Sequence, residues 1–246
     1  MNQQTLILDL DDTLIHCNKY FTQAKHEFTK KMKEWMITPS EEEIMQKQLE
    51  IDLKSVEIHG LLSEKFPESL VATYFYFCQK YCRGIKANEI EHVRNIGRRV
   101  FEMEVEPFPY MYDVLNKLQE DGHQLHLFTG GDVKNQTRKI RQLGLEHYFE
   151  DRIYISQHKN SKALRKVINK IPANKNSIWM IGNSLKTDII PAIELGINAI
   201  HIPSEIEWSY NIVDIDMEQK STFAELTSLL NLPVFFREYI FYNEAM

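Results

Sequence analysis

The stretch TLILDLDDTL, residues 5–14, decides the fold. It begins as a short apolar run and ends in acids, which is typical of a buried parallel strand that delivers polar groups at its carboxyl end. Residues two apart on a strand share a face, so we expect Asp9 and Asp11 to point into one site. An Asp-x-Asp pair alone is weak evidence, because acids that follow a strand often only cap the next helix.

A pair of carboxylates in one site suits phosphoryl transfer. Two carboxylates held together repel each other, so one of them must bind a metal ion or hold a proton. One carboxylate, ionised at neutral pH, can attack phosphorus and form an acyl phosphate. The other can protonate the departing alkoxide and then deprotonate the water that hydrolyses the intermediate.

Strands and helices alternate along the chain after Pro107. We expect strands over 124–129, 152–156, 177–182 and 198–202, and helices over 111–121, 134–143, 162–170 and 189–195. This alternation predicts an α/β fold with a Rossmann-like, three-layer core, in which helices cover both faces of a parallel sheet. In the tail, we expect a final helix over 222–230, followed by a segment that packs along the core edge.

The stretch from Asn18 to about Glu104 has a different texture. Apolar residues recur at spacings of three and four, and strand-like alternation is absent. This pattern predicts an insert of about four helices. We therefore expect a catalytic core formed by residues 1–15 and 107–246, and a small all-helical domain formed by residues 16–106.

Two further strand ends carry polar residues. Thr129 and Gly130 end one predicted strand and precede a helix, where a hydroxyl group and exposed N–H groups can form a phosphate cradle. Asp188 follows another strand and could join Asp9 in a set of oxygen ligands suited to Mg²⁺. Helix capping is the alternative reading of each segment. Ligands of parallel sheets bind beyond the carboxyl ends of the strands, so we expect these strand ends to meet.

Taken in this order, the three strand ends resemble the haloacid-dehalogenase-like hydrolase superfamily. The family's first motif, Asp-x-Asp-x-Thr, matches residues 9–13, and its second, a Ser or Thr that ends a strand, matches Thr129. Its fourth, Gly-Asp-x-x-x-x-Asp, matches residues 182–188, except that Asn183 replaces the first acid. The resemblance covers about residues 1–15 and 107–203, and the insert looks like the family's α-helical cap, which would select the substrate.

The resemblance implies roles for individual residues. Asp9 would be the nucleophile and Asp11 the general acid and base, while Thr129 and the Gly130 N–H group would hold the phosphoryl group. The family's third motif is a lysine that offsets negative charge, and Lys159 is favoured over Lys162 because it lies just past a predicted strand.

The resemblance also implies a magnesium cofactor. Mg²⁺ would be held by the Asp9 carboxylate, the Asp11 backbone carbonyl and Asp188, with Asn183 acting through a water molecule. A neutral amide attracts the cation less than a carboxylate does, so Asn183 predicts weaker binding.

The expected function is hydrolysis of small phosphomonoesters, of the nucleotide or sugar-phosphate class, through an aspartyl-phosphate intermediate. Dehalogenation has no leaving oxygen to protonate, and relatives that catalyse it lack an acid at the position of Asp11. A phosphomutase and a non-catalytic binding protein are alternatives on the same fold, and Asn183 is the only feature that favours the latter.

The composition limits the partners and the location. The chain has 246 residues and a formal net charge of −6, whereas a nucleic-acid footprint requires clustered positive charge. No stretch approaches the roughly 20 apolar residues that span a membrane, and the N-terminus does not read as a signal peptide. We therefore expect a cytoplasmic protein with a small phosphorylated substrate, no nucleic-acid polymer and no membrane partner. The sequence predicts no oligomeric state.

Overall fold

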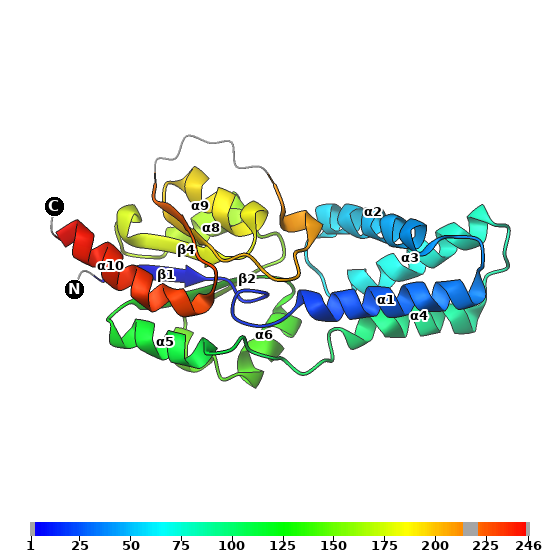
Figure 1. The fold of residues 1–246 in the computed structure, drawn as a ribbon, viewed down its shortest axis with the longest axis horizontal. Helices are drawn as coiled ribbons and strands as arrows, with labels where there is room; N and C mark the ends of the chain where they lie inside the picture. Colours follow the sequence, from blue (N-terminus) through cyan, green and yellow to red (C-terminus); the bar gives the residue numbers. More distant parts are fainter. Residues whose placement is uncertain (1–2, 214–220, 245–246) are drawn as a thin grey trace. The chain divides into compact units, whose positions relative to one another are not determined.

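The apolar run at residues 5–8 forms a central strand of a parallel sheet in the computed structural model, which describes residues 3–213 and 221–244 (Figure 1). The strand order is β3-β2-β1-β4-β5-β6, and every neighbouring pair is parallel. The strands are β1 (Thr5–Leu8), β2 (Gln124–Gly130), β3 (Ile153–Ser156), β4 (Ile178–Gly182), β5 (Asn198–His201) and β6 (Phe223–Glu225). The predicted parallel α/β sheet is confirmed.

Helices cover both faces of the sheet, which gives the predicted three-layer, Rossmann-like core (Figure 1). Side chains of a strand alternate between faces, so Leu6 and Leu8 pack with α5, α6 and α10, whereas Ile7 packs with α8 and α9. The helices are α5 (Met111–Glu120), α6 (Val133–Gln142), α7 (Glu146–Phe149), α8 (Ser161–Ile168), α9 (Ile190–Leu195) and α10 (Leu232–Glu244).

The helix expected over residues 222–230 is wrong. Phe223 and Glu225 of β6 instead pair with Ala199 and His201 of β5. A short apolar run is ambiguous between helix and strand, and here the open edge of β5 supplies backbone partners that settle the choice. The helix comes later, as α10, after a short 3₁₀ turn at Leu229–Asn231.

All of residues 17–104 are described, and they form a second compact unit with its own hydrophobic core. Phe28, Tyr74 and Phe77 are its largest buried side chains. Ser40 caps the second helix, because its hydroxyl accepts the Glu43 N–H at 3.1 Å. The helices of this unit are α1 (Asn18–Trp35), α2 (Glu41–His59), α3 (Lys65–Lys80) and α4 (Ala87–Arg99). The first unit comprises residues 1–16 and 105–246.

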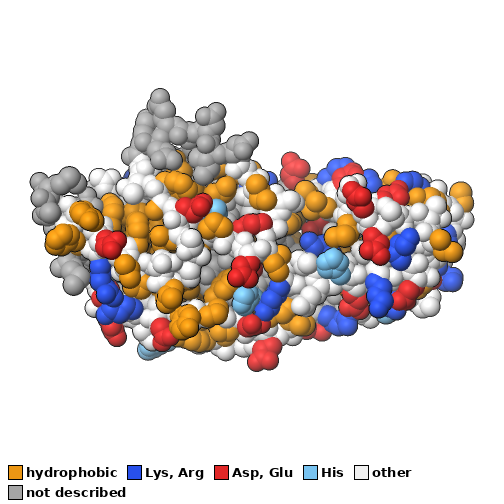
Figure 2. Space-filling view, viewed as in Figure 1, with side chains coloured by type: hydrophobic (Ala, Val, Ile, Leu, Met, Phe, Trp, Pro, Cys, Tyr) orange, Lys and Arg blue, Asp and Glu red, His pale blue; other side chains and the backbone are white. Residues whose placement is uncertain are grey.

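Acidic and basic side chains intermingle on the surface of the helical unit (Figure 2). Arg94 of α4 pairs with Glu68 of α3 at 2.7 Å in this way. A more buried pair joins the α3–α4 turn to α4: Arg83 donates to both carboxylate oxygens of Glu89, at 2.6 and 2.7 Å. Glu89 is only 4% exposed, so this pair lies inside the unit rather than on its solvated face.

Candidate active site

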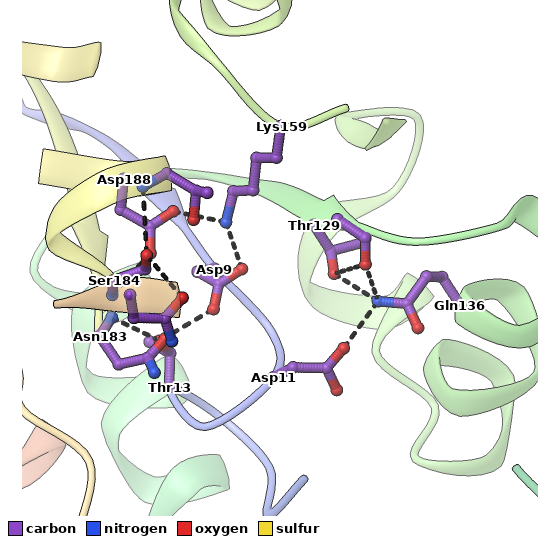
Figure 3. A network of polar contacts seen from close by, with 12 residues as sticks. Asp9, Asp11, Thr13, Thr129, Gln136, Lys159, Asn183, Ser184 and Asp188 are labelled. Carbon is purple, nitrogen blue, oxygen red and sulfur yellow. Dashed lines mark hydrogen bonds and ion pairs between the residues drawn. The ribbon is translucent and has the colours of Figure 1, made fainter. Parts of the chain in front are cut away.

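Asp9 stands at the carboxyl end of β1. Its N–H group donates to Ile181 O at 2.9 Å, which extends the pairing with β4 by one residue and fixes the direction of the side chain. Its carboxylate is buried, and Oδ2 accepts the Thr13 hydroxyl at 3.0 Å (Figure 3). The chain then turns sharply at Asp12, whose φ of +59° is left-handed.

Lys159 brings a buried positive charge to Asp9. It follows β3, and its ammonium group contacts Asp9 Oδ1 and lies 2.5 Å from Asp188 Oδ1 (Figure 3). Two buried carboxylates therefore share one ammonium group. Burial raises the pKa of Asp9 to about 7, although Lys159 opposes the shift, and the charge of Asp188 adds to it. Burial would lower the pKa of Lys159, but the Asp188 and Asp9 carboxylates outweigh it and raise that pKa.

The loop after β4 carries Asp188 back into the site. The Ser184 hydroxyl accepts the Thr187 N–H at 3.1 Å, and a π-helical turn at Leu185–Ile189 follows. The Ser184 N–H donates to Asp188 Oδ2 at 3.1 Å. A Cβ atom at Gly182 would lie 2.2 Å from Asp188 Oδ2, so only glycine leaves room for this carboxylate.

Asn183 lies between this loop and the loop after β1. Its N–H group donates to Thr13 Oγ1 at 3.1 Å, and its carbonyl oxygen lies 3.0 Å from His201 Nε2. The Thr13 hydroxyl lies 3.5 Å from Asn183 Oδ1, in addition to its bond with Asp9. Thr13 therefore connects Asp9 to Asn183.

The donor atoms around Asp9 fit a hard divalent cation. Among the residues that the structure describes, no three His, Cys, Asp or Glu side chains gather closely enough to hold a metal ion by themselves. Magnesium ordinarily takes only one or two protein carboxylates and completes its shell with water and substrate oxygens. Asp9 and Asp188 supply two buried carboxylates around a single ammonium group, so the site has excess negative charge for a cation to balance.

Thr129 is the penultimate residue of β2 and comes just before Gly130, Gly131 and the start of α6. Its side chain is fully buried. Asp132 caps α6 by accepting the Asn135 N–H at 2.8 Å, so the helix starts directly at the sheet edge. A hydroxyl group, a glycine N–H and a helix start together make a suitable place for an anion.

Asp11 turns toward this second group of residues rather than toward Lys159 (Figure 3). Lys139 Nζ lies 2.6 Å from its Oδ1 and 2.8 Å from its Oδ2, and Gln136 Nε2 donates to Oδ2 at 2.9 Å. Gln136 Nε2 also donates to Thr129 Oγ1 at 2.5 Å and to Gly130 O at 2.8 Å. Gln136 thus connects the Asp11 carboxylate to Thr129 and Gly130 at the end of β2.

The structure gathers the predicted site residues in two groups. In the first, Lys159 joins Asp9 to Asp188, and Thr13 joins Asp9 to Asn183. In the second, Gln136 joins the Asp11 side chain to Thr129 and Gly130, whereas Lys162 is exposed. Gln136 and Lys139 were missed by the sequence reasoning. Their i, i+3 spacing in the first turns of a helix that begins at the site edge was the only available signal.

A sequence model of the haloacid dehalogenase-like hydrolases matches residues 3–196. The chain belongs to this family. The matched span includes both groups of site residues and the whole helical unit of residues 17–104. The resemblance predicted from three strand ends is therefore confirmed, and the protein is a haloacid dehalogenase-like hydrolase.

Two relatives of this hydrolase are named glyceraldehyde 3-phosphate phosphatase. The one from Methanocaldococcus jannaschii is 23% identical over 231 residues, which cover 92% of this chain and 95% of that protein. The one from Methanothermobacter thermautotrophicus is 25% identical over 104 residues, which cover 41% of this chain and 46% of that protein. The second match thus spans about half the relative's length.

Solved structures share the fold of this hydrolase. A haloacid dehalogenase-like family hydrolase from Xanthomonas campestris superimposes with a TM-score of 0.79 at 23% identity, covering 96% of this chain and 91% of that one. The HAD-hydrolase YfnB of Bacillus subtilis, solved bound to magnesium, gives a TM-score of 0.61 at 19% identity, covering 96% and 99%. Among the described residues, every helix is too short or too polar to cross a membrane.

Proposed function

We propose that this hydrolase is a magnesium-dependent phosphatase that hydrolyses small phosphomonoesters through an aspartyl-phosphate on Asp9. One observation carries the proposal: Asp9 is buried at the carboxyl end of the central strand, with Lys159 on one carboxylate oxygen and Thr13 on the other. Such contacts fix the direction of a nucleophile and keep it out of bulk water. A second buried carboxylate, Asp188, shares the same lysine.

In the first step, an Asp9 carboxylate oxygen attacks the phosphorus atom of the ester. The new bond joins Asp9 to phosphorus as an acyl phosphate, and the bond from phosphorus to the leaving oxygen breaks. Asp11 donates a proton to that oxygen, so that the product leaves as a neutral alcohol. Asp11 lies two residues after the nucleophile, in the loop that turns at Asp12.

In the second step, Asp11 acts as a base instead of an acid. Its carboxylate, left ionised by the first step, removes a proton from a water molecule as the water oxygen attacks phosphorus. The bond between phosphorus and the Asp9 oxygen breaks, which releases inorganic phosphate and restores the Asp9 carboxylate. Each residue thereby returns to its starting protonation state.

The remaining residues hold the phosphoryl oxygens. Thr129 Oγ1 accepts a hydrogen bond from Gln136 and makes only a long contact, 3.5 Å, as donor to Gly130 O, so its hydrogen can turn to a phosphoryl oxygen. The Gly130 N–H group would donate beside it, and Lys159 would offset negative charge between nucleophile and phosphate. Donors fixed in place before the reaction stabilise charge that develops in the transition state.

Magnesium fits the donor set beside Asp9. The Asp9 carboxylate, the Asp11 backbone carbonyl and Asp188 would hold it, with Asn183 acting through a water molecule. When bound, the ion would neutralise charge on the phosphoryl oxygens and help to align them with the nucleophile. Asn183 contributes no charge to this set, which favours a modest affinity for the ion.

The substrate class is a small phosphorylated metabolite, of the sugar-phosphate or nucleotide type. Two relatives named glyceraldehyde 3-phosphate phosphatase support the phosphatase activity and place triose phosphates first among the compounds to test. We further propose that the helical unit of residues 17–104 acts as a cap that selects the substrate, because an inserted lid commonly excludes water from such a site.

The test is release of inorganic phosphate from a panel of phosphomonoesters, with magnesium and with a chelator. We expect turnover that requires magnesium and that falls by at least about 10³-fold in Asp9→Asn, because the amide cannot form the acyl phosphate. Asp151→Asn is the matched control, since that acid is 94% exposed. Magnesium-dependent turnover that persists in Asp9→Asn would disprove the covalent mechanism, and no turnover on any ester would disprove the proposed activity.

A further inference from the structure

The Asp11 carboxylate has side-chain donors on both of its oxygens. Lys139 Nζ lies 2.6 Å from Oδ1 and 2.8 Å from Oδ2. Gln136 Nε2 donates to Oδ2 at 2.9 Å (Figure 3). The Asp11 side chain is 24% exposed and that of Lys139 is 12% exposed, so the ion pair is largely shielded from solvent. A shielded, charge-assisted pair of this kind holds a carboxylate more firmly than a surface ion pair does.

Gln136 links the same carboxylate to the phosphate cradle. Its side chain is 1% exposed, and its amide nitrogen also donates to Thr129 Oγ1 at 2.5 Å and to Gly130 O at 2.8 Å. These acceptors include a carboxylate oxygen and a carbonyl oxygen, so the NH₂ side of the amide must face them. A single buried amide therefore orients both the proton-transfer residue and the hydroxyl expected to bind phosphate.

The backbone is shaped to admit Gln136. Gly131 has a φ of +142°, and a Cβ atom there would lie 2.9 Å from Gln136 Cγ and 3.0 Å from its Cδ. A side chain at residue 131 would push the amide away from Asp11 and Thr129. This is a second observation, independent of the hydrogen bonds, that the chain reserves space for Gln136 at this point.

We propose that Gln136 and Lys139 are positioning residues that hold Asp11 for proton transfer to the leaving group. The inference rests on the proposed phosphatase function and adds two residues to it. When the Asp11 O–H bond breaks and its hydrogen joins the leaving oxygen, the electron pair stays on the Asp11 carboxylate, next to the Lys139 ammonium group. Gln136 holds that carboxylate next to the phosphoryl group that Thr129 and Gly130 would bind.

The basicity of the leaving group distinguishes a positioning role of these residues from a purely structural one. An alkyl phosphate, such as glycerol phosphate, releases a strongly basic alkoxide that needs a proton, whereas p-nitrophenyl phosphate releases a weakly basic phenolate that does not. The ratio kcat/KM reports the steps up to the first phosphoryl transfer and leaves out hydrolysis of the intermediate. A loss of Asp11 positioning should therefore lower kcat/KM much more for the alkyl ester.

The experiment measures kcat/KM for both esters in Lys139→Met, Lys139→Arg and the control Lys134→Met, whose lysine is exposed on the same helix. We expect Lys139→Met to lose roughly 100-fold on glycerol phosphate but no more than about fivefold on p-nitrophenyl phosphate. Lys139→Arg should recover most of the loss, because it restores a cation with hydrogen-bond donors. The aryl ester also serves as the check that each variant is folded.

Gln136→Met adds a second readout, because it keeps the shape of the side chain and removes its donors. We expect it to reproduce the leaving-group effect and also to weaken competitive inhibition by inorganic phosphate by roughly tenfold, since Thr129 loses the hydrogen bond from Gln136 that orients its hydroxyl. Equal losses on the two esters, or no loss on either, would overturn the positioning role and leave the phosphatase function intact. A wild-type protein that hydrolyses no alkyl or aryl phosphomonoester of the panel would instead overturn the proposed function, and this inference with it.

Discussion

Replacing Gly182 by alanine should damage the site without changing any group that reacts. An alanine Cβ would stand 2.2 Å from Oδ2, 2.5 Å from Cγ and 2.9 Å from Cβ of Asp188. These distances are well inside van der Waals contact, and Asp188 is fully buried, so its side chain has to move. Movement would break its hydrogen bond with the Ser184 N–H, at 3.1 Å, and its ion pair with Lys159, at 2.5 Å.

The size of the effect follows from these contacts. Overpacking a core costs about 1–3 kcal/mol, and a lost hydrogen bond to a charged group adds about 1.5–3 kcal/mol. We therefore expect Gly182→Ala to lower the free energy of unfolding by about 3–5 kcal/mol. Each kcal/mol corresponds to roughly 2–4 °C in a chain of this length, so Tm should fall by at least about 6 °C.

Denaturant unfolding and magnesium titration of activity measure the two consequences. The displaced carboxylate should raise the magnesium concentration needed for half-maximal activity by at least about tenfold. The matched control is Gly84→Ala, because no atom lies within 4 Å of a Cβ at Gly84, and its stability should change by less than about 1 kcal/mol. A Gly182→Ala protein as stable as that control, with an unchanged magnesium requirement, would refute the reasoning.

Three further predictions follow from buried charges and a buried histidine. Lys159→Met should lower phosphate release by at least about 100-fold in a steady-state assay, whereas Lys162→Met should match the wild type, since Lys162 is exposed. Burial lowers the pKa of His126 to about 4, so the unfolded chain takes up a proton at a higher pH than the folded chain does. The free energy of unfolding therefore falls as the pH drops from 6.5 to 4. In urea titrations, His126→Phe should lose about 2 kcal/mol less of that free energy than the wild type over the same range. Arg83→Met should lower the free energy of unfolding of the helical unit at neutral pH by about 3 kcal/mol, because it removes two charge-assisted hydrogen bonds from the buried Glu89 carboxylate, whose pKa of about 2 depends chiefly on Arg83. Calorimetry that finds no change would contradict this.

The sheet and its helices were predictable because burial leaves a clear pattern in the sequence. β1 and β4 are buried along their whole length, and both read as continuous apolar runs. The stretch around β6 was not predictable, because its three residues match a helical pattern as well as a strand. Pairing with β5, a long-range contact that no local pattern encodes, decided its structure.

The positions of the site residues were likewise predictable only in part. Asp9, Thr129 and Asp188 could be placed near one another because parallel strands end at one edge of the sheet. The direction of the Asp11 side chain could not be predicted, because side chains alternate between faces only within a strand, and β1 ends at Leu8. Gln136 is one of several polar residues on α6, and its burial depends on how that helix packs.

The most direct test of the proposed mechanism is chemical trapping of the phosphorylated aspartate during turnover. Sodium borohydride reduces an acyl phosphate to an alcohol, so it would convert a phosphorylated Asp9 to homoserine, which peptide mass spectrometry can locate. The proposed mechanism predicts homoserine at residue 9 when magnesium and a phosphomonoester are both present, and unmodified Asp9 when either is withheld. Phosphate release at the full rate, with Asp9 unmodified after the borohydride quench, would contradict it.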